Sequence, residues 1–280
     1  MVEKKIDRLS ALIKRFRIEA RVYTPALQSG GLDEFTPNFY VIGKDAVGFS
    51  NIADDRLQGL ENALVFFPRG LPDDVKLTTQ ADEDGYVSAI VDTGGDINPI
   101  SLALPDLVVI KLDETPTLQT VAEILFDEVV SPRCGGQSVI DRLCEIVVIR
   151  LLRHLIETGK AQIGLVGGLA HPNLSLAIVA IHEAPEKNWR LEELAELAAM
   201  SRTSFVNSFR DVMGVTPGEY LSQWRLTLAR LALAKGEPLK AIVNKVGFSS
   251  SAALSRAFKR RYGVSPKQGM QNYLSLGTQT

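Results

Sequence analysis

The sequence predicts an α+β protein of two domains: a strand-rich N-terminal half with covering helices, then an all-α C-terminal half. Short apolar runs broken by Gly, Pro, Asn and Asp occupy residues 22–112, which is typical of a β-sandwich or barrel. In the C-terminal half, Gly214-Val-Thr-Pro217 returns as Gly263-Val-Ser-Pro266, an offset of 49 residues (263 − 214). A repeat at fixed spacing indicates two copies of one supersecondary unit.

Charge is divided unevenly along the chain, although its formal net value is only −2. Residues 171–280 carry 14 Lys and Arg against 8 Asp and Glu, whereas residues 1–170 carry 17 against 25. The repeat-containing part is therefore basic, as phosphate contacts require. Because basic charge alone often marks only a solvated helix face, this inference depends on the repeat as well.

The second copy of the repeat has the pattern of a helix-turn-helix. Residues 239–246 have helical periodicity and stop at Gly247, which tolerates the left-handed conformation of a sharp helix end. One of the serines that follow can cap the next helix. In that helix Leu254 and Phe258, four residues apart, place one stripe inward. Small polar and basic residues lie outside this stripe, as in DNA-reading helix-turn-helix motifs.

The first copy has the same inward stripe, because Phe205 and Phe209 correspond to Leu254 and Phe258 at the offset of 49. Between the copies, residues 217–235 have the periodicity of one helix, roughly 30 Å long at 1.5 Å per residue. Successive major-groove faces on one side of B-DNA are about 34 Å apart. Two motifs on such a spacer predict a reader of two adjacent half-sites.

Three motifs near the second copy are specific in combination: Pro-Leu-(x)2-Ile-(x)3-Val-Gly-Phe-Ser-Ser over 238–250, Ser-Arg-x-Phe-Lys-Arg over 255–260, and Gly-x-Ser-Pro over 263–266. With them, residues 171–270 resemble the DNA-binding domain of AraC/XylS-family transcriptional regulators. The family usually continues with an aromatic-arginine pair, where this chain has Gly269-Met270. The resemblance implies an activator that binds double-stranded promoter DNA as a homodimer and contacts RNA polymerase.

The second helix of each motif supplies most side chains that we predict to contact DNA. Asn207 can pair with adenine, Thr203 can contact a thymine methyl or base edge, and Arg256 is the candidate for guanine. The remaining arginines, the lysine and several serines suit phosphates, with two serines as weaker base readers. The predicted set is Ser201, Arg202, Thr203, Asn207, Arg210, Ser249, Ser250, Ser251, Ser255, Arg256 and Lys259. Any one exposed serine or asparagine is more often merely solvated.

The N-terminal half carries a second resemblance. Ala63-Leu-Val-Phe-Phe-Pro-Arg-Gly70 is similar to the second cupin motif, a strand that ends in Pro-x-Gly. Metal-binding cupins place histidines in the barrel, but this chain has none before His154 and has Asp73 three residues after Gly70. We therefore expect a cupin-like sensing barrel and no metal centre. The strands predicted for it are 39–42, 46–49, 63–67, 86–91 and 107–112.

Helices are predicted at 7–16, packed against the residues that follow, and after the strands at 117–130 and 137–158. The last has an apolar stripe wider than packing on one small barrel demands. In similar regulators such helices form the dimer contact, and we expect the same here. The alternative is that the stripe covers the barrel within one chain. The domains are then 1–160 for sensing and dimerisation, 161–172 as linker, and 173–280 for DNA binding.

An arginine cluster, Arg15, Arg17 and Arg21, is the candidate effector site. Arg17-Ile-Glu-Ala-Arg21 resembles the Arg-x-x-x-Arg motif with which PilZ domains bind cyclic di-GMP. Guanidinium groups suit this ligand because they pair bidentately with phosphate and stack on bases. The usual PilZ companion, Asp/Asn-x-Ser-x-x-Gly, is missing. A basic surface turn without ligand, and a sugar bound in the barrel, are the alternatives.

Other function classes have less support in the sequence. Cys134 and Cys144 make neither a disulfide framework nor a four-ligand zinc site. The three histidines are scattered, and neither a Ser/His/Asp arrangement nor a P-loop is indicated. Neither an apolar signal core nor a run of ~20 apolar residues occurs. We expect a cytoplasmic regulator without enzymatic activity, cofactor or membrane contact. A cupin enzyme with a helical appendage and a ligand-free architectural DNA-binding protein are the competing interpretations.

Overall fold

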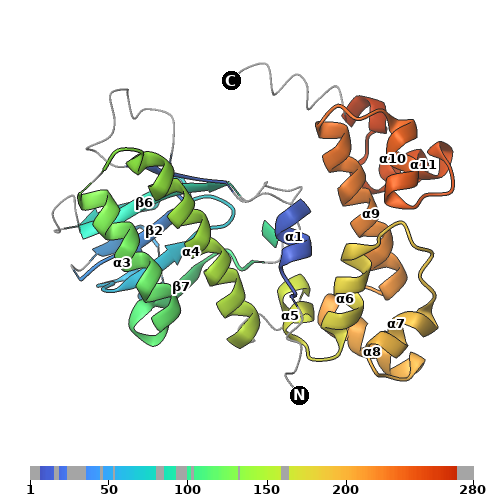
Figure 1. The fold of residues 1–280 in the computed structure, drawn as a ribbon, viewed down its shortest axis with the longest axis horizontal. Coiled ribbons are helices and arrows are strands. Elements are labelled where there is room, and N and C mark those ends of the chain that lie inside the picture. The colour runs from blue at the N-terminus through green and yellow to red at the C-terminus, as the bar shows by residue number, and fades with distance from the viewer. Residues whose placement is uncertain are drawn as a thin grey trace. The chain divides into compact units, whose positions relative to one another are not determined.

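The fold was obtained as a computed structural model that describes residues 7–15, 19–23, 36–44, 47–52, 54–79, 85–92, 100–101, 104–131, 133–158 and 164–269 (Figure 1). Its contacts divide the chain into two compact units. The N-terminal unit comprises Phe16–Asp96 and Ile100–Thr158, and the C-terminal unit contains Gly159–Thr280 together with the first helix. We describe each unit by itself.

The N-terminal unit is built on two antiparallel sheets. Five strands lie in the order β1-β6-β2-β4-β7, and β3 pairs with β5 in a second sheet. Two strands, β1 and β5, were not predicted from the sequence. Strand β1 lies at one edge and pairs with β6 through Ala20 opposite Val91. The strands are β1 (Glu19–Tyr23), β2 (Phe39–Ile42), β3 (Val47–Ser50), β4 (Ala63–Phe66), β5 (Lys76–Thr79), β6 (Tyr86–Asp92) and β7 (Val108–Lys111).

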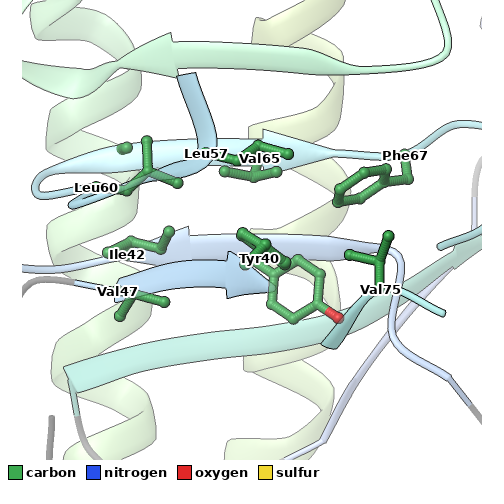
Figure 2. Packing of buried hydrophobic residues seen from close by; sticks show 10 residues of the cluster. Tyr40, Ile42, Val47, Leu57, Leu60, Val65, Phe67 and Val75 are labelled. Carbon is green, nitrogen blue, oxygen red and sulfur yellow. The ribbon is translucent and has the colours of Figure 1, made fainter. Parts of the chain in front are cut away.

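Apolar side chains fill the space between the two sheets. Tyr40 packs edge-on against Phe49, with ring centroids 5.1 Å apart, and Phe49 packs likewise against Phe67 at 5.7 Å. Figure 2 shows side chains from several strands and connecting segments converging on this core. The cluster consists of Tyr40, Ile42, Val47, Phe49, Leu57, Leu60, Ala63, Val65, Phe67 and Val75.

Two helices, α3 (Pro116–Val130) and α4 (Gly136–Thr158), lie over the other face of the five-stranded sheet (Figure 1). Successive strand residues point to opposite faces, so Phe39 and Phe66 face away from the core between the sheets. Both are fully buried and pack edge-on at 5.5 Å. Most of the α4 stripe is buried too: Ile140, Cys144, Val147, Val148, Leu151, Leu152 and Leu155. This stripe therefore covers the sheet within one chain, as in the alternative interpretation above.

Helix α4 also satisfies the backbone of the edge strand β1. The Val22 N–H donates to the Asp141 carboxylate at 3.2 Å, and the Gln137 amide donates to the Val22 carbonyl at 3.4 Å. On the neighbouring strand pair, the buried side chain of Asn38 accepts from the Val91 N–H at 2.8 Å and donates to its carbonyl at 3.1 Å. Buried or edge backbone groups need such partners.

The C-terminal unit is all helical, apart from its connections. Arg8, just before α1, donates to the carbonyls of Leu169 and Ala170 at the end of α5. Thus α1, expected to pack on the residues that follow it, contacts α6 of the C-terminal unit. The helices are α1 (Ser10–Arg15), α5 (Gly164–Ala170), α6 (Leu174–Glu183), α7 (Leu191–Leu197), α8 (Arg202–Met213), α9 (Pro217–Ala234), α10 (Leu239–Val246) and α11 (Ser251–Tyr262).

Helix α5 lies where the sequence predicted a linker over 161–172. It packs against α6 and α8, and a Cβ at Gly168 would lie 2.4 Å from the Met213 sulfur and 2.6 Å from the Ile178 Cδ1. Glycine here permits the close approach of α5 to both helices. Among the described residues no single helix is long and apolar enough to cross a membrane; α5 and α6 together pass by length and composition, but are bent by 115°.

The two cysteines differ in burial and should differ in reactivity. Cys134 is exposed, whereas burial raises the pKa of the Cys144 thiol far above its usual range. Because the thiolate is the nucleophile, one equivalent of iodoacetamide should react with the native protein and two with the denatured protein, as counted by intact mass. Alkylation of both thiols at similar rates in the native protein would contradict this packing of α4.

Candidate nucleic-acid interface

The first motif consists of α7, a short turn and α8. The Ser201 hydroxyl caps α8 by accepting from the Ser204 N–H at 3.3 Å, so the predicted cap is confirmed. Phe205 and Phe209 are fully buried and pack edge-on at 5.5 Å. The side chains predicted to contact DNA, Arg202, Thr203, Asn207 and Arg210, are all exposed. By helical periodicity Thr203 and Asn207 lie opposite the buried phenylalanines, whereas Arg202 lies in the first turn on their side.

The second motif consists of α10, a turn at Gly247 and α11. Of the two candidate caps, Ser250 is the one that accepts from the Ala253 N–H, at 3.1 Å. Leu254 and Phe258 are buried. Ser255 is only partly exposed, whereas the other predicted contact residues of this motif are exposed: Ser249, Ser250, Ser251, Arg256 and Lys259.

The sequence repeat is also a structural repeat. Helices α8 and α11 have 12 residues each and end at glycines in the left-handed conformation, Gly214 (φ 73°) and Gly263 (φ 76°). Reciprocal side-chain and backbone hydrogen bonds follow each glycine. Thr216 exchanges them with Glu219 at the start of α9, and Ser265 exchanges them with Gln268. The turn after Gly263 therefore forms despite the unusual Gly269-Met270; Met270 lies outside the described residues.

Helix α9 joins the two motifs and contacts one at each end. Near its start, Tyr220 packs against Phe209 of α8 with ring centroids 5.6 Å apart. Near its end, the Arg230 guanidinium lies 5.1 Å from the centroid of the Tyr262 ring of α11. Its 18 residues correspond to a length of about 27 Å. The predicted spacer helix is thus present.

His182 of α6 is a buried polar group that sequence reasoning placed only at the end of a helix. Its Nε2 is 2.7 Å from the Tyr220 hydroxyl, and its ring stacks on Trp224 with centroids 4.0 Å apart. Burial raises the pKa of Tyr220 far above its usual range, so the hydroxyl stays neutral. The four-residue spacing of Tyr220 and Trp224 predicts that they share one face of α9. It does not predict that His182 contacts both.

One side chain predicted to hold a phosphate, Arg202, already has a charged partner within the protein. Arg202 forms an exposed ion pair with Glu192 of α7, at 2.5 Å. The pKa of Glu192 is lowered first by a hydrogen bond from its own backbone N–H and then by the Arg202 guanidinium. Exposed pairs of this kind contribute little and can exchange partners. DNA phosphates would therefore compete with Glu192 for Arg202.

The proposed effector arginines are only partly described. Arg17 lies outside the described residues, as does the side chain of Arg15. Arg21 is exposed on β1 beside a pocket of about 220 Å³ between β1 and α4. The other residues lining the pocket are Glu19, Ala20, Ser138, Asp141, Arg142 and Glu145, and Arg142 is itself paired with Glu145 at 2.7 Å. Three carboxylates against two arginines oppose an anionic ligand at this spot.

A catalytic metal site finds no counterpart among the described residues. In the ranges given above, no group of three or more His, Cys, Asp or Glu side chains could hold a metal ion. The core between the sheets is lined by apolar side chains and Tyr40, with Tyr86 packed against it. These residues suit packing and offer few groups for acid–base chemistry.

Comparison with known proteins decides the family. A helix-turn-helix domain family matches residues 194–272, and a cupin family matches residues 46–157. The HTH-type transcriptional regulator AlkR of Acinetobacter baylyi is 33% identical over 231 residues, which cover 79% of this chain and 75% of that protein. The putative AraC-like transcription regulator of Streptomyces lividans is 36% identical over 168 residues. The chain belongs to the AraC family of transcriptional regulators.

Coverage differs among the AraC-family relatives. The match spans 58% of this chain but only 55% of the Streptomyces protein, so the chain spans little more than half the length of some relatives that it matches. Among solved structures, the DNA-binding domain of AdpA in complex with a target DNA is 27% identical. It covers 39% of this chain and 100% of that domain, with a TM-score of 0.37. The family assignment therefore rests on the sequence relatives.

Removing the Tyr220 hydroxyl tests the packing beneath the first motif. Tyr220→Phe should lower the unfolding free energy of the C-terminal unit by about 1–3 kcal/mol, because it deletes a buried hydrogen bond to His182. Both tryptophans, Trp189 and Trp224, lie in this unit, so their fluorescence reports its urea unfolding. Thr203→Ala, at an exposed hydroxyl, should stay within about 0.5 kcal/mol of the wild type. Equal effects of the two substitutions would argue against a buried His182–Tyr220 pair.

Proposed function

We propose that this AraC-family protein regulates transcription by binding a two-part DNA site, and that its cupin-like N-terminal unit senses a small molecule. The observation that carries the proposal is the duplicated motif at the two ends of α9. Each recognition helix is capped by a serine, buries an apolar stripe and exposes polar and basic side chains. The length of α9, about 27 Å, suits two adjacent major-groove segments on one side of the duplex.

Base reading and phosphate binding fall to different side chains in this proposal. Asn207 on α8 and Arg256 on α11 present groups that pair bidentately with adenine and guanine, and Thr203 contacts a thymine methyl or base edge. Lys259 and the arginines near the helix ends hold phosphates, which fixes the orientation of the protein but carries no sequence information. The serine hydroxyls at the start of each helix, Ser201 and Ser250, act mainly as caps.

Selection from a random duplex library tests the proposal. The purified full chain is incubated with the library at about 0.15 M salt, and bound duplexes are amplified and sequenced over several rounds. We expect enrichment of one site with two conserved blocks about 10 base pairs apart. Enrichment of no sequence, with only salt-sensitive binding to every duplex, would reduce the protein to a non-specific polyanion binder.

Substitutions at Arg256 and Lys259, one turn apart on α11, should weaken DNA binding in different ways. Arg256→Ala should cost about 1–3 kcal/mol on the selected site and relax the base preference at one position. Lys259→Ala should weaken binding to all sequences alike and reduce the salt slope by about 1. Titration of fluorescent duplexes that vary at each position separates the two effects. A uniform loss across sequences for Arg256→Ala would remove its base-reading role.

The homodimer expected for the family has a candidate surface on the outer side of α4. Val139 and Ile146, two turns apart, are 43% and 42% exposed. Because the rest of the apolar stripe covers the sheet, any dimer through α4 has to use this narrower face. We also propose that the protein activates transcription by contacting RNA polymerase, as the family resemblance implies.

Binding of cyclic di-GMP at the arginine cluster (Arg15, Arg17 and Arg21) can be tested directly. If cyclic di-GMP binds there despite the three carboxylates beside Arg21, titration calorimetry of the full chain gives binding heat that Arg17→Ala abolishes, because two guanidinium groups share the phosphates. Arg56→Ala is the control, since Arg56 is exposed, pairs with Asp54 at 2.6 Å and does not line the pocket beside Arg21. Absence of heat, or unchanged binding by Arg17→Ala, removes the dinucleotide. The same titration with sugars then tests the alternative effector.

A further inference from the structure

The loop between α6 and α7, residues 184–190, is bound to helix α9 by one arginine. Arg225 donates from Nε to the Pro185 carbonyl at 2.7 Å and from Nη2 to the Lys187 carbonyl at 2.9 Å. A guanidinium can bind two carbonyls at once because its donors have a fixed planar geometry. The loop leads directly into α7, so this contact connects the first motif to α9 at a second place, beyond the packing of Tyr220.

The turn of the second motif lies against the same loop. Gly247 has a φ of 78°, and a Cβ built there would lie 2.6 Å from the Glu186 Cα and 2.9 Å from the Arg225 Nη2. The first neighbour is backbone, so it cannot move aside as a flexible side chain can. Glycine is therefore needed here for two reasons: the left-handed conformation and the close approach. Helix α9, the loop and the α10–α11 turn meet at this junction.

The loop itself is held in one conformation by local contacts. The Trp189 indole donates to the Ala184 carbonyl at 2.9 Å, and Lys187 lies 3.8 Å above the Trp189 ring. Lys187 also pairs with Glu193 on α7 at 3.0 Å, and the Arg190 N–H donates to the Glu193 carboxylate at 2.8 Å. The junction thus joins the second motif to a braced segment of the first.

We infer that Arg225 is a positioning residue that fixes the angle between the two motifs and thereby makes binding depend on the spacing of the half-sites. The inference rests on the proposed function. A rigid connection gives the second motif a high effective concentration at a correctly placed half-site and a low one elsewhere. One base pair of displacement moves a half-site by about 3.4 Å and turns it by about 35°. A loosened junction tolerates that displacement better.

The test uses the duplex that the wild-type chain selects, with versions in which one base pair is inserted or deleted between the conserved blocks. The wild-type protein should lose roughly 10-fold or more in affinity on either altered duplex. Arg225→Ala should bind the selected duplex about 3–10-fold more weakly, yet lose only about 3-fold or less on changing the spacing. Lys235→Ala removes the same charge at the exposed end of α9 and should keep the wild-type ratio.

Gly247→Ala approaches the same junction from the other motif and keeps Arg225, so it should also reduce the penalty for altered spacing. Tryptophan fluorescence confirms that each variant is folded before binding is measured. If folded Arg225→Ala or Gly247→Ala keeps the wild-type spacing ratio, the positioning role is wrong while the proposed function stands. If the wild-type chain selects no duplex, the proposed function fails and this inference fails with it.

Discussion

The continuity of helix α9 is the constraint on which the C-terminal unit depends. Thr216 and Glu219 cap its first turn reciprocally, and Pro217 occupies a position where its missing N–H costs nothing. From there the internal hydrogen bonds of the helix fix the separation of whatever packs at its two ends. Phe209 contacts its beginning and Tyr262 its end. A kink in α9 would misplace both recognition helices, however well each was folded.

In the two recognition helices, the buried residues stabilise the fold and the exposed residues are the ones proposed to contact DNA. In α8 and α11 the aromatic and leucine side chains are buried, so the exposed residues can vary without altering the fold. The exposed ion pair between Arg202 and Glu192 shows how such a surface remains adaptable, because an arginine held by a solvated carboxylate can exchange it for a phosphate at little cost. The N-terminal unit buries most of its apolar residues within its own sheets and helices, and leaves a few, such as Val139 and Ile146 of α4, exposed.

Features that local chemistry determines could be predicted from the sequence: the end of α10 at Gly247, the serine caps of α8 and α11, and the spacer helix. Features that depend on distant partners could not. Glu19–Tyr23 is a strand only because β6 pairs with it, and the glycine-rich α5 is a helix that Met213 and Ile178 contact closely. The wide apolar stripe of α4 indicated that this face is buried, but it did not indicate whether the sheet of the same chain or a second protomer covers it. Of the candidate site, the exposed residues were predictable, whereas the Arg225–Gly247 junction joins segments over 20 residues apart and leaves no local pattern.

Hydroxyl-radical footprinting of the selected duplex tests the central claim most directly, because it maps the face of the DNA that the protein covers. Two motifs fixed at the ends of one helix of about 27 Å should protect two tracts on the same face, with centres about 10 base pairs apart. One protected tract, or two tracts on opposite faces of the duplex, would contradict the account.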